Sequence, residues 1–311
     1  MNLILLFIPF CIATILLFLF QKVFINKGIV DKINKRSSHI SLATRSGGLA
    51  LFSTIFLISS ISYLNGVKLF DYSILVPLSL LFTVGLYDDI YSVDFKLKFI
   101  FQIIAAKIII DSGLIIDNLH GVFGIDQLSR VSAQLLTLVV IVAIINAINF
   151  IDGIDTLALF VTSFFILSFE FFSTETSDYL SLTAIILSSF IPMMYFNLKK
   201  NNKIFLGDSG SLFIGGIVAI YVLHILSNSY LIIGKFDINK ILFVFSVLMY
   251  PIIDITRVVL VRLFNGRSPF SADRNHIHHI LNNSVKSHFK VVVIIIMLSI
   301  LNLIIIQLLF N

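Results

Sequence analysis

The stretch SAQLLTLVVIVAIINAINFIDGIDTL, from Ser132 to Leu157, decides the fold. Its apolar run at 132–149 is long enough to cross about 30 Å of hydrocarbon as a helix. At the end of this run, two asparagines and two aspartates lie at three-residue spacing, from Asn146 to Asp155. Ionisable side chains at the edge of a bilayer-spanning segment are costly and usually mark a site. The stretch therefore predicts a membrane helix that carries a polar site at one bilayer edge.

The rest of the chain repeats this pattern of apolar runs ending in polar clusters. Hydrophobic residues make up 58% of the sequence and charged residues 13%, whereas soluble domains average about 25% charged residues. About ten apolar runs are long enough to span a bilayer, at 3–20, 48–64, 73–87, 98–116, 132–149, 157–173, 179–197, 211–232, 241–261 and 291–310. We therefore expect an all-α polytopic membrane protein with about ten transmembrane helices.

The basic residues set the expected orientation. Helix crossings place alternate loops on opposite sides, and one set of loops carries 16 lysines and arginines while the other carries four. Cytoplasmic loops are enriched in Lys and Arg, so we expect both termini outside and every polar cluster on the cytoplasmic side. The active site is therefore expected on the cytoplasmic face.

Asp88 and Asp89 end the third apolar run. Adjacent carboxylates repel each other unless a cation or several donors offset their charge. The pair therefore indicates a divalent metal or a lysine partner, and oxygen ligands of this type suit Mg²⁺. The alternative is that both aspartates cap the next segment and face water.

Asn149, Asp152 and Asp155 are spaced i, i+3, so they are neighbours on a continuing helix. Their acceptors and amides suit a sugar nucleotide, a metal, or a phosphate held through a metal. The alternative is a polar helix end stabilised by Asx turns.

The segment FLGDSGS, Phe205 to Ser211, leads directly into the eighth apolar run. Its glycines can expose backbone N–H groups, and a helix N-terminus attracts anions. Asp208 at this position can hold a metal that accompanies a diphosphate. The segment lacks the Gly-Lys-Ser/Thr ending of a P-loop, and the alternative is an ordinary capped helix start.

The last loop of the basic set reads RLFNGRSPFSADRNHIHHIL and contains His276, His278 and His279. A His-x-His-His run without a nearby cysteine is a poor tetrahedral zinc set. With Arg267 and Arg274 close by, phosphate binding is the better interpretation. The alternative is an interfacial loop attracted to anionic lipid headgroups.

Two pairs of opposite charge lie within apolar runs. Lys107 and Asp111 are spaced i, i+4, and Asp254 and Arg257 are spaced i, i+3. Both spacings predict ion pairs that reduce the cost of burial. We interpret the first pair as structural, and expect the second to help orient the histidine loop.

Taken together, the motifs resemble those of the polyprenyl-phosphate N-acetylhexosamine-1-phosphate transferases of glycosyltransferase family 4, in the undecaprenyl-phosphate GlcNAc-1-phosphate transferase-like branch. Five of them follow in the family's order: D-x-x-N-x-R-S-S-H at Asp31 to His39, D-D at Asp88-Asp89, N-x-x-N-x-x-D-G-x-D at Asn146 to Asp155, G-D-x-G-S-L at Gly207 to Leu212, and S-P-F-x-x-D-R-x-H-x-H-H at Ser268 to His279. One departure is Thr156, which stands where glycine is usual.

The resemblance implies an enzyme with a single integral membrane transferase domain over residues 1–311. It implies that undecaprenyl phosphate attacks the β-phosphorus of a UDP-N-acetylhexosamine, with release of UMP and with Mg²⁺ (or Mn²⁺) as cofactor. The resemblance makes UDP-GlcNAc the preferred donor, with modified hexosamines such as N-acetylfucosamine second, and the product would start a cell-surface polysaccharide such as O-antigen. The expected location is the bacterial cytoplasmic (inner) membrane. We expect no nucleic-acid partner, and a homodimer by analogy with relatives.

The resemblance also implies roles for the candidate residues. It makes Asp88, Asp89 and Asp152 catalytic, and places the metal on Asp208 with Asp88 and Asp89. The substrate-binding residues it implies are Asn149, Asp155, Lys96, Arg267, His276, His278 and His279.

Two other functions fit a polytopic chain. A transporter or flippase of an anionic lipid or solute would explain the helices and intramembrane pairs, but would favour polar residues near the midplane and repeated halves. A non-catalytic scaffold for polymer assembly would not need the acidic set. The gathering of acids at one interface favours the transferase.

Overall fold

The computed structural model of the chain describes residues 3–31, 42–119, 121–173, 177–227, 240–268 and 275–310. Every candidate site residue given a role above lies within these ranges. Of the first motif only Asp31 is described, and residues 269–274 of the last motif, with Arg274, lie outside.

Within the described residues, each apolar run of the sequence overlaps a helix, and the run at 241–261 overlaps two. The helices are α1 (Ile4–Asn26), α2 (Gly47–Leu64), α3 (Leu75–Tyr91), α4 (Phe95–Asp111), α5 (Arg130–Ile151), α6 (Leu157–Phe172), α7 (Leu180–Leu198), α8 (Gly207–Leu226), α9 (Lys240–Val247), α10 (Met249–Phe264), α11 (Ile277–Val285) and α12 (His288–Phe310). The structure also has the 3-10 helices η1 (Tyr72–Ile74) and η2 (Val122–Gly124), and the strands β1 (Ala43–Thr44) and β2 (Lys203–Ile204).

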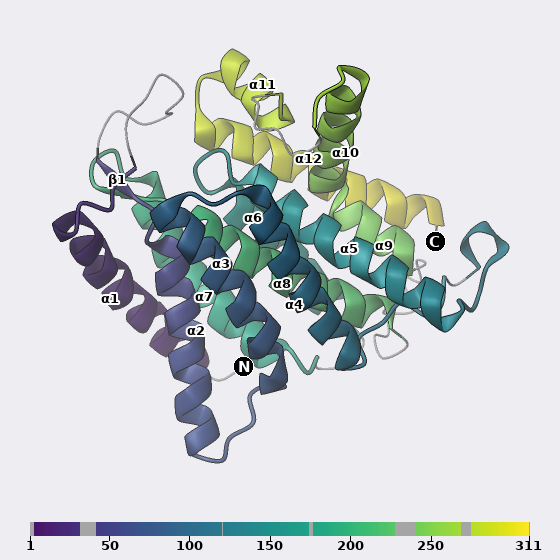
Figure 1. Cartoon of the computed structure of the whole chain (residues 1–311), viewed down its shortest axis with the longest axis horizontal. Coiled ribbons are helices and arrows are strands. Elements are labelled where there is room, and N and C mark those ends of the chain that lie inside the picture. The colour runs from purple at the N-terminus through teal and green to yellow at the C-terminus, as the bar shows by residue number, and fades with distance from the viewer. Residues whose placement is uncertain are drawn as a thin grey trace. The chain divides into compact units, whose positions relative to one another are not determined.

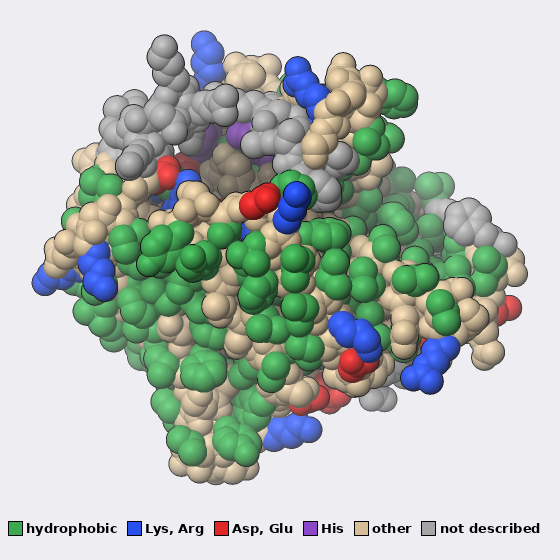
Figure 2. Space-filling view, in the orientation of Figure 1, with side chains coloured by type: hydrophobic (Ala, Val, Ile, Leu, Met, Phe, Trp, Pro, Cys, Tyr) green, Lys and Arg blue, Asp and Glu red, His purple; other side chains and the backbone are tan. Residues whose placement is uncertain are grey.

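Within the described ranges, seven helices are long and apolar enough to cross a membrane, or eight if the bent pair α9 and α10 forms one span. α6 is a shorter apolar helix of 16 residues. Figure 2 shows hydrophobic side chains covering α2 and α3, as expected for helices that face lipid. The chain is therefore an all-α, multi-pass membrane protein. The count of about ten, the outside termini and the cytoplasmic active face stay predictions.

The chain divides into two compact units. The first unit contains Met1–Ala105 and Ser177–Ile214, and the second contains Ala106–Thr176 and Gly215–Asn311. α4 and α8 each begin in the first unit and end in the second. A single transferase domain over the whole chain stays a prediction.

The first unit is built on α1, which packs against α2 and α7, while α2 also contacts α3 (Figure 1). β1 and β2 form a two-stranded parallel ladder with Ala43 opposite Lys203 and Thr44 opposite Ile204. The buried Asn197 side chain donates to the carbonyl of Ile204 at 2.8 Å. These bonds fix the chain immediately before α8.

In the second unit, α5 packs against α6 and α10, and α12 packs against α6, α9, α10 and α11. The axes of α9 and α10 differ by 75°. Pro251 lies in the first turn of α10 and has no N–H to donate to the carbonyl of Val247, four residues earlier. The bond to the Val247 carbonyl is therefore missing at the place where the chain bends.

Candidate active site

The first unit brings Asp88, Lys98 and Asp208 together from three helices. Lys98, in the first turns of α4, places its Nζ 3.2 Å from Asp88 Oδ2 at the end of α3. The same Nζ lies 2.7 Å from Asp208 Oδ2 at the start of α8. We call these three residues the carboxylate–lysine cluster. One positive charge thus lies between two carboxylates. Of the Asp88-Asp89 pair, for which the sequence suggested a divalent metal or a lysine partner, Asp88 contacts this lysine.

The Asp89 carboxylate accepts hydrogen bonds from the backbone of α8. Its Oδ1 accepts from the Asp208 N–H and its Oδ2 from the Ser209 N–H, both at 2.9 Å. The first N–H groups of a helix have no partner within the helix, and a carboxylate there also interacts favourably with the helix dipole. Asp89 therefore holds the start of α8, and with it the position of Asp208.

Gly207 makes this close approach of α3 and α8 feasible. Its φ of +74° lies in the left-handed region that favours glycine. A methyl group at Gly207 would lie 2.6 Å from Asp89 Oδ2. The first glycine of G-D-x-G-S-L is thus required for its backbone angle and for the space that the Asp89 carboxylate occupies.

Arg45 adds positive charge to the same unit. Its guanidinium donates to Asp31 Oδ1 at 2.7 Å. Burial lowers the pKa of Arg45, but the charges of Asp31, Asp89 and Asp208 outweigh burial and raise the pKa above its ordinary value. Arg45 therefore stays a cation near the carboxylates.

Lys96, the lysine expected from the sequence, has an exposed side chain at the start of α4. Its backbone N–H donates to Asp94 Oδ1 at 3.3 Å. Lys98, two residues later, is the lysine that contacts the aspartates. The structure therefore adds Lys98 to the candidate site, and a substrate-binding role for Lys96 stays a prediction.

The second unit organises the histidines around Asp254 of α10. Asp254 is fully buried, and its Oδ2 lies 2.6 Å from His276 Nδ1. Its Oδ1 accepts from the Ile277 N–H at 2.6 Å, at the start of α11. The expected ion pair with Arg257 is wrong, because both Asp254 oxygens bond elsewhere and Arg257 donates to the carbonyl of Asn275. Asp254 nevertheless orients the histidine segment.

His278 is buried against the turn that follows α5. Its Nδ1 lies 3.0 Å from the hydroxyl of Tyr250, and its Nε2 would lie 2.4 Å from a methyl group at Gly153. Burial, then the nearby charge of His279, lowers the pKa of His278 to about 3. His278 is therefore a neutral packing partner of the Asp152–Asp155 turn at physiological pH.

We expect stability to fall as the pH drops from about 6.5 towards 3. The unfolded chain protonates His278 at an ordinary pKa of about 6.5, whereas the folded chain keeps it neutral down to about pH 3. Between these values the unfolded state binds one more proton, so the free energy of unfolding falls by up to about 1.4 kcal/mol per pH unit. Thermal unfolding in detergent at several pH values checks this.

The matched variant is His278→Gln, which does not titrate but can still bond to the hydroxyl of Tyr250. Its unfolding temperature should depend less on pH than that of the wild type. The other ionisable groups around His278 (Tyr250, Asp254, His276, His279 and His288) are present in both proteins and cancel in the comparison. Equal pH slopes would contradict the assignment of a neutral, buried His278.

Asn149 lies in the last turn of α5, and Asp152 and Asp155 lie in the turn that follows the helix. The Asp152 N–H donates to the carbonyl of Asn149 at 3.3 Å. Asp155 Oδ2 lies 2.8 Å from Nδ1 of His288, the first residue of α12. The turn therefore ties α5 to α12, and His288, which no motif marked, is part of the arrangement.

In the second unit, the buried arginine near the histidine segment is Arg262, whereas the sequence pointed to Arg267. Arg267 is exposed, just past the end of α10. Arg262, one turn earlier, is buried, with its guanidinium 5.6 Å from the centre of the Phe150 ring. The Phe150 ring in turn meets His276 at 5.6 Å. A phosphate-binding role for Arg267 stays a prediction, and Arg262 stabilises the histidine segment.

Lys107 and Asp111 form the ion pair expected from their spacing. Both side chains are exposed rather than internal, so the pair supports α4 at its surface. It contacts no candidate site residue, which makes it a useful reference pair for experiments.

The fold and the site define a class: a multi-pass membrane protein with a half-buried lysine between two carboxylates and a separately ordered histidine segment. The family model described as glycosyl transferase family 4 matches residues 72–227. The match covers half of the chain and includes Asp88, Asp89, Asp152 and Asp208. The chain belongs to glycosyl transferase family 4.

Characterised relatives match over most of their length. The chain is 32% identical over 297 residues to the decaprenyl-phosphate N-acetylglucosaminephosphotransferase of Mycobacterium tuberculosis, covering 86% of this chain and 72% of that protein. It is 30% identical over 284 residues to the undecaprenyl-phosphate alpha-N-acetylglucosaminyl 1-phosphate transferase of Salmonella typhimurium, covering 88% and 74%. A probable undecaprenyl-phosphate N-acetylglucosaminyl 1-phosphate transferase of Bacillus subtilis is 30% identical over 280 residues, covering 88% and 75%.

Proposed function

We propose that this chain transfers N-acetylhexosamine-1-phosphate, preferably GlcNAc-1-phosphate, from a UDP-sugar to undecaprenyl phosphate, with release of UMP. The reaction would begin a cell-surface polysaccharide at the bacterial cytoplasmic membrane. The observation that carries the proposal is the convergence of Asp88 and Asp208 on Lys98. It occurs in a chain whose relatives are named as polyprenyl-phosphate transferases of N-acetylglucosamine phosphate.

Asp88 and Asp208 would hold Mg²⁺, with Mn²⁺ as the alternative ion. Their Oδ2 atoms already converge on one positive charge, within 3.2 Å of a single nitrogen. Mg²⁺ commonly takes one or two carboxylates and completes its shell with water and substrate phosphates. The described residues contain no cluster of three or more acidic, histidine or cysteine side chains suited to a metal, which is compatible with such a site. When bound, the ion offsets negative charge on the diphosphate.

The chemical step needs positioning more than proton transfer. An oxygen of the lipid phosphate bonds to the β-phosphorus of the UDP-sugar, and the bond from that phosphorus to the oxygen bridging the two phosphates breaks. UMP leaves with the bridging oxygen. A phosphate monoester is largely ionised near neutral pH, so a carboxylate base is hardly required. Lys98 and Arg45 supply the positive charge that phosphoryl transfer uses.

Asp89 has a different role in this proposal. Both of its oxygens are occupied by backbone N–H groups of α8, so we assign it to positioning Asp208. The catalytic or metal-binding role expected from the sequence stays a prediction for Asp89.

The second unit supplies the substrate contacts in this proposal. Asn149, Asp152 and Asp155 would bind the nucleotide, from a turn that His278 and His288 hold in place. Among the three motif histidines, His279 is half-buried, whereas His276 and His278 are buried. His279 and the exposed Arg267 are therefore the better placed to meet phosphate or sugar.

Replacing Lys98 by methionine should lower the transfer rate by about a hundredfold or more. Without the ammonium, the carboxylates of Asp88 and Asp208 repel each other and the site loses a cation that phosphoryl transfer uses. The rate of UMP release by purified protein measures the effect. Lys107→Met removes the lysine of the surface ion pair in the same helix and should leave the rate unchanged. Similar rates for both variants would contradict the role of Lys98.

The decisive test of the function is UMP release from a panel of UDP-sugars, with undecaprenyl phosphate, with and without Mg²⁺. Release that needs both the lipid and the metal is the expected result, and the best donor identifies the sugar. Accumulation of labelled substrate inside sealed vesicles without UMP release would instead support the transporter. No release from any donor by folded protein would contradict the proposal.

A further inference from the structure

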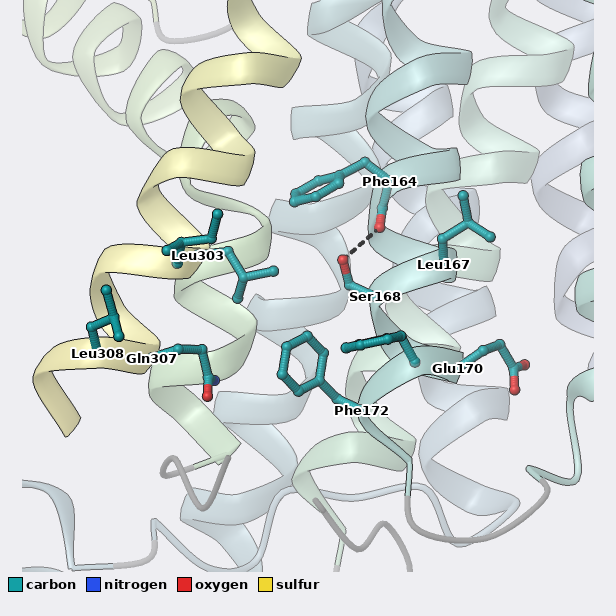
Figure 3. A pocket seen from close by; sticks show the side chains of 10 residues that line it. Phe164, Leu167, Ser168, Glu170, Phe172, Leu303, Gln307 and Leu308 are labelled. Atoms are coloured by element: carbon teal, nitrogen blue, oxygen red, sulfur yellow. Dashed lines mark hydrogen bonds between the residues drawn. The ribbon is translucent and has the colours of Figure 1, made fainter. Parts of the chain in front are cut away.

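An apolar cavity of about 770 Å³ lies between α6 and α12, within the second unit (Figure 3). Phe164, Leu167 and Phe172 of α6 form one wall, and Leu303 and Leu308 of α12 form the other. The lining belongs to the C-terminal parts of both helices. α12 is long and apolar enough to cross the membrane, so a molecule that enters this cavity comes from the bilayer.

One polar side chain in the cavity wall lacks the hydrogen bonds that burial demands. Gln307 of α12 is 6% exposed, and within the described residues neither its Nε2 nor its Oε1 has a hydrogen-bond partner. Figure 3 shows its side chain directed from α12 towards Phe172. A buried amide without partners is costly, and such groups are rare in folded proteins. Gln307 therefore needs a hydrogen-bonding group that the described residues do not supply.

Glu170 and Ser168 are the other polar residues of the lining, and neither is a hydrogen-bond partner of Gln307. Figure 3 shows the Glu170 carboxylate directed away from Gln307. The hydroxyl of Ser168 donates to the carbonyl of Phe164 at 2.8 Å, one turn earlier in α6. Gln21, in the first unit, shows how a membrane-buried glutamine is normally satisfied: its Nε2 donates to the carbonyl of Asn202 at 2.6 Å. The two glutamines are buried alike, at 6% and 7% exposure, and differ in their partners.

We propose that this cavity binds a diacyl glycerophospholipid of the bilayer. An acyl chain fills the apolar space, and an ester carbonyl accepts a hydrogen bond from Gln307 Nε2. An amine or hydroxyl of the headgroup donates to Gln307 Oε1. The position of Gln307 in the bilayer fits this chemistry. Gln307 lies in the last turn of α12, and Phe172 ends α6. Spanning helices end at the interface, where the ester carbonyls of the lipids lie.

This site is separate from the proposed transferase site. α6 begins at Leu157, directly after the turn that contains Asp152 and Asp155. The cavity is lined from the opposite end of the same helix, by Glu170 to Phe172 among others. Leu157 and Phe172, the two ends of α6, are 15 residues apart, or roughly 22 Å. The lipid is therefore neither acceptor nor donor in the transfer, and its role is to complete the packing of α6 against α12.

The test compares lipid retention by wild type and Gln307→Leu. Protein delipidated in detergent is titrated with dioleoyl phosphatidylethanolamine, dioleoyl phosphatidylglycerol or undecaprenyl phosphate, and bound lipid is counted by native mass spectrometry. We expect one glycerophospholipid per wild-type chain, and binding weakened about tenfold in Gln307→Leu, as the loss of buried hydrogen bonds predicts. Gln307→Met, which keeps the side-chain length, should behave like Gln307→Leu.

Gln21→Leu is the matched control, since it removes a buried glutamine whose amide is satisfied. It should leave lipid binding unchanged and lower the unfolding temperature. In delipidated protein, Gln307→Leu should instead raise the unfolding temperature, because it removes an unsatisfied buried amide. Unchanged glycerophospholipid binding by Gln307→Leu would overturn the proposal. Gln307-dependent binding of undecaprenyl phosphate in preference to the two glycerophospholipids would also overturn it.

Discussion

Asp208→Asn should abolish transfer, lowering the rate of UMP release about a thousandfold or more, while the protein remains folded in the membrane. Asparagine has nearly the same shape, but it carries no charge with which to hold a cation or pair with Lys98. Loss of a cation that stabilises the transition state by several kcal/mol corresponds to an effect of this size. The start of α8 should survive, because the Asp208 backbone N–H, not its side chain, bonds to Asp89.

Two further variants separate charge from fold. Asp111→Asn, in the exposed pair with Lys107, removes a carboxylate elsewhere and should leave the rate unchanged. Asp89→Asn should instead lower the free energy of unfolding by about 3 kcal/mol. Each oxygen of the Asp89 carboxylate accepts from one backbone N–H group, and an asparagine amide has only one oxygen with which to do so. Mn²⁺ binding measured by electron paramagnetic resonance should be lost in Asp208→Asn. Normal transfer by Asp208→Asn would contradict the assignment of Asp208 as a metal ligand.

Much of the fold follows from the sequence, because a bilayer leaves few options for an apolar run. A chain in hydrocarbon must satisfy its own backbone, so runs of about 20 apolar residues become helices. The helix ends were less predictable: α1 continues beyond Phe20 to Asn26, since hydrogen bonding of the backbone does not stop where side chains become polar. The 75° bend after Val247 also needed the structure, although Pro251 marks it.

The choice of the site lysine shows where sequence reasoning ends. Lys96 and Lys98 are two residues apart, so on α4 they project about 200° apart. Both spacing and charge are compatible with either lysine. Packing alone directs Lys98 towards Asp88 and Asp208 and leaves Lys96 exposed.

Asp254 and Thr156 illustrate two other limits. The i, i+3 spacing predicted an Asp254–Arg257 ion pair. The Asp254 carboxylate is instead hydrogen-bonded to His276, which lies 22 residues away along the chain and is brought close by the fold. At Thr156 the motif departs from glycine, and the residue has a φ of +64°. A β-branched residue rarely adopts that angle, which explains why glycine is usual at this position of the motif.

Gly207→Ala should lower the free energy of unfolding by about 2–5 kcal/mol and reduce transfer strongly. Two effects combine: the left-handed φ of +74° costs roughly 1–2 kcal/mol with a side chain, and the new methyl group would lie 2.6 Å from Asp89 Oδ2. Relief of that contact displaces Asp89, which loosens its bonds to the start of α8 and moves Asp208 away from Lys98. Thermal unfolding in detergent and the rate of UMP release measure both consequences.

Gly66→Ala separates the two effects. Gly66 has a φ of +70°, almost the angle of Gly207, but no atom lies within 4 Å of the place a methyl group would take. Its substitution should therefore cost only the strain of about 1–2 kcal/mol and leave transfer intact. The difference between the two variants isolates the contact with Asp89, and with it the dependence of Asp208 on how Asp89 is held. Equal losses in both variants would mean that the backbone angle alone requires glycine at 207, and that Asp89 does not position the site.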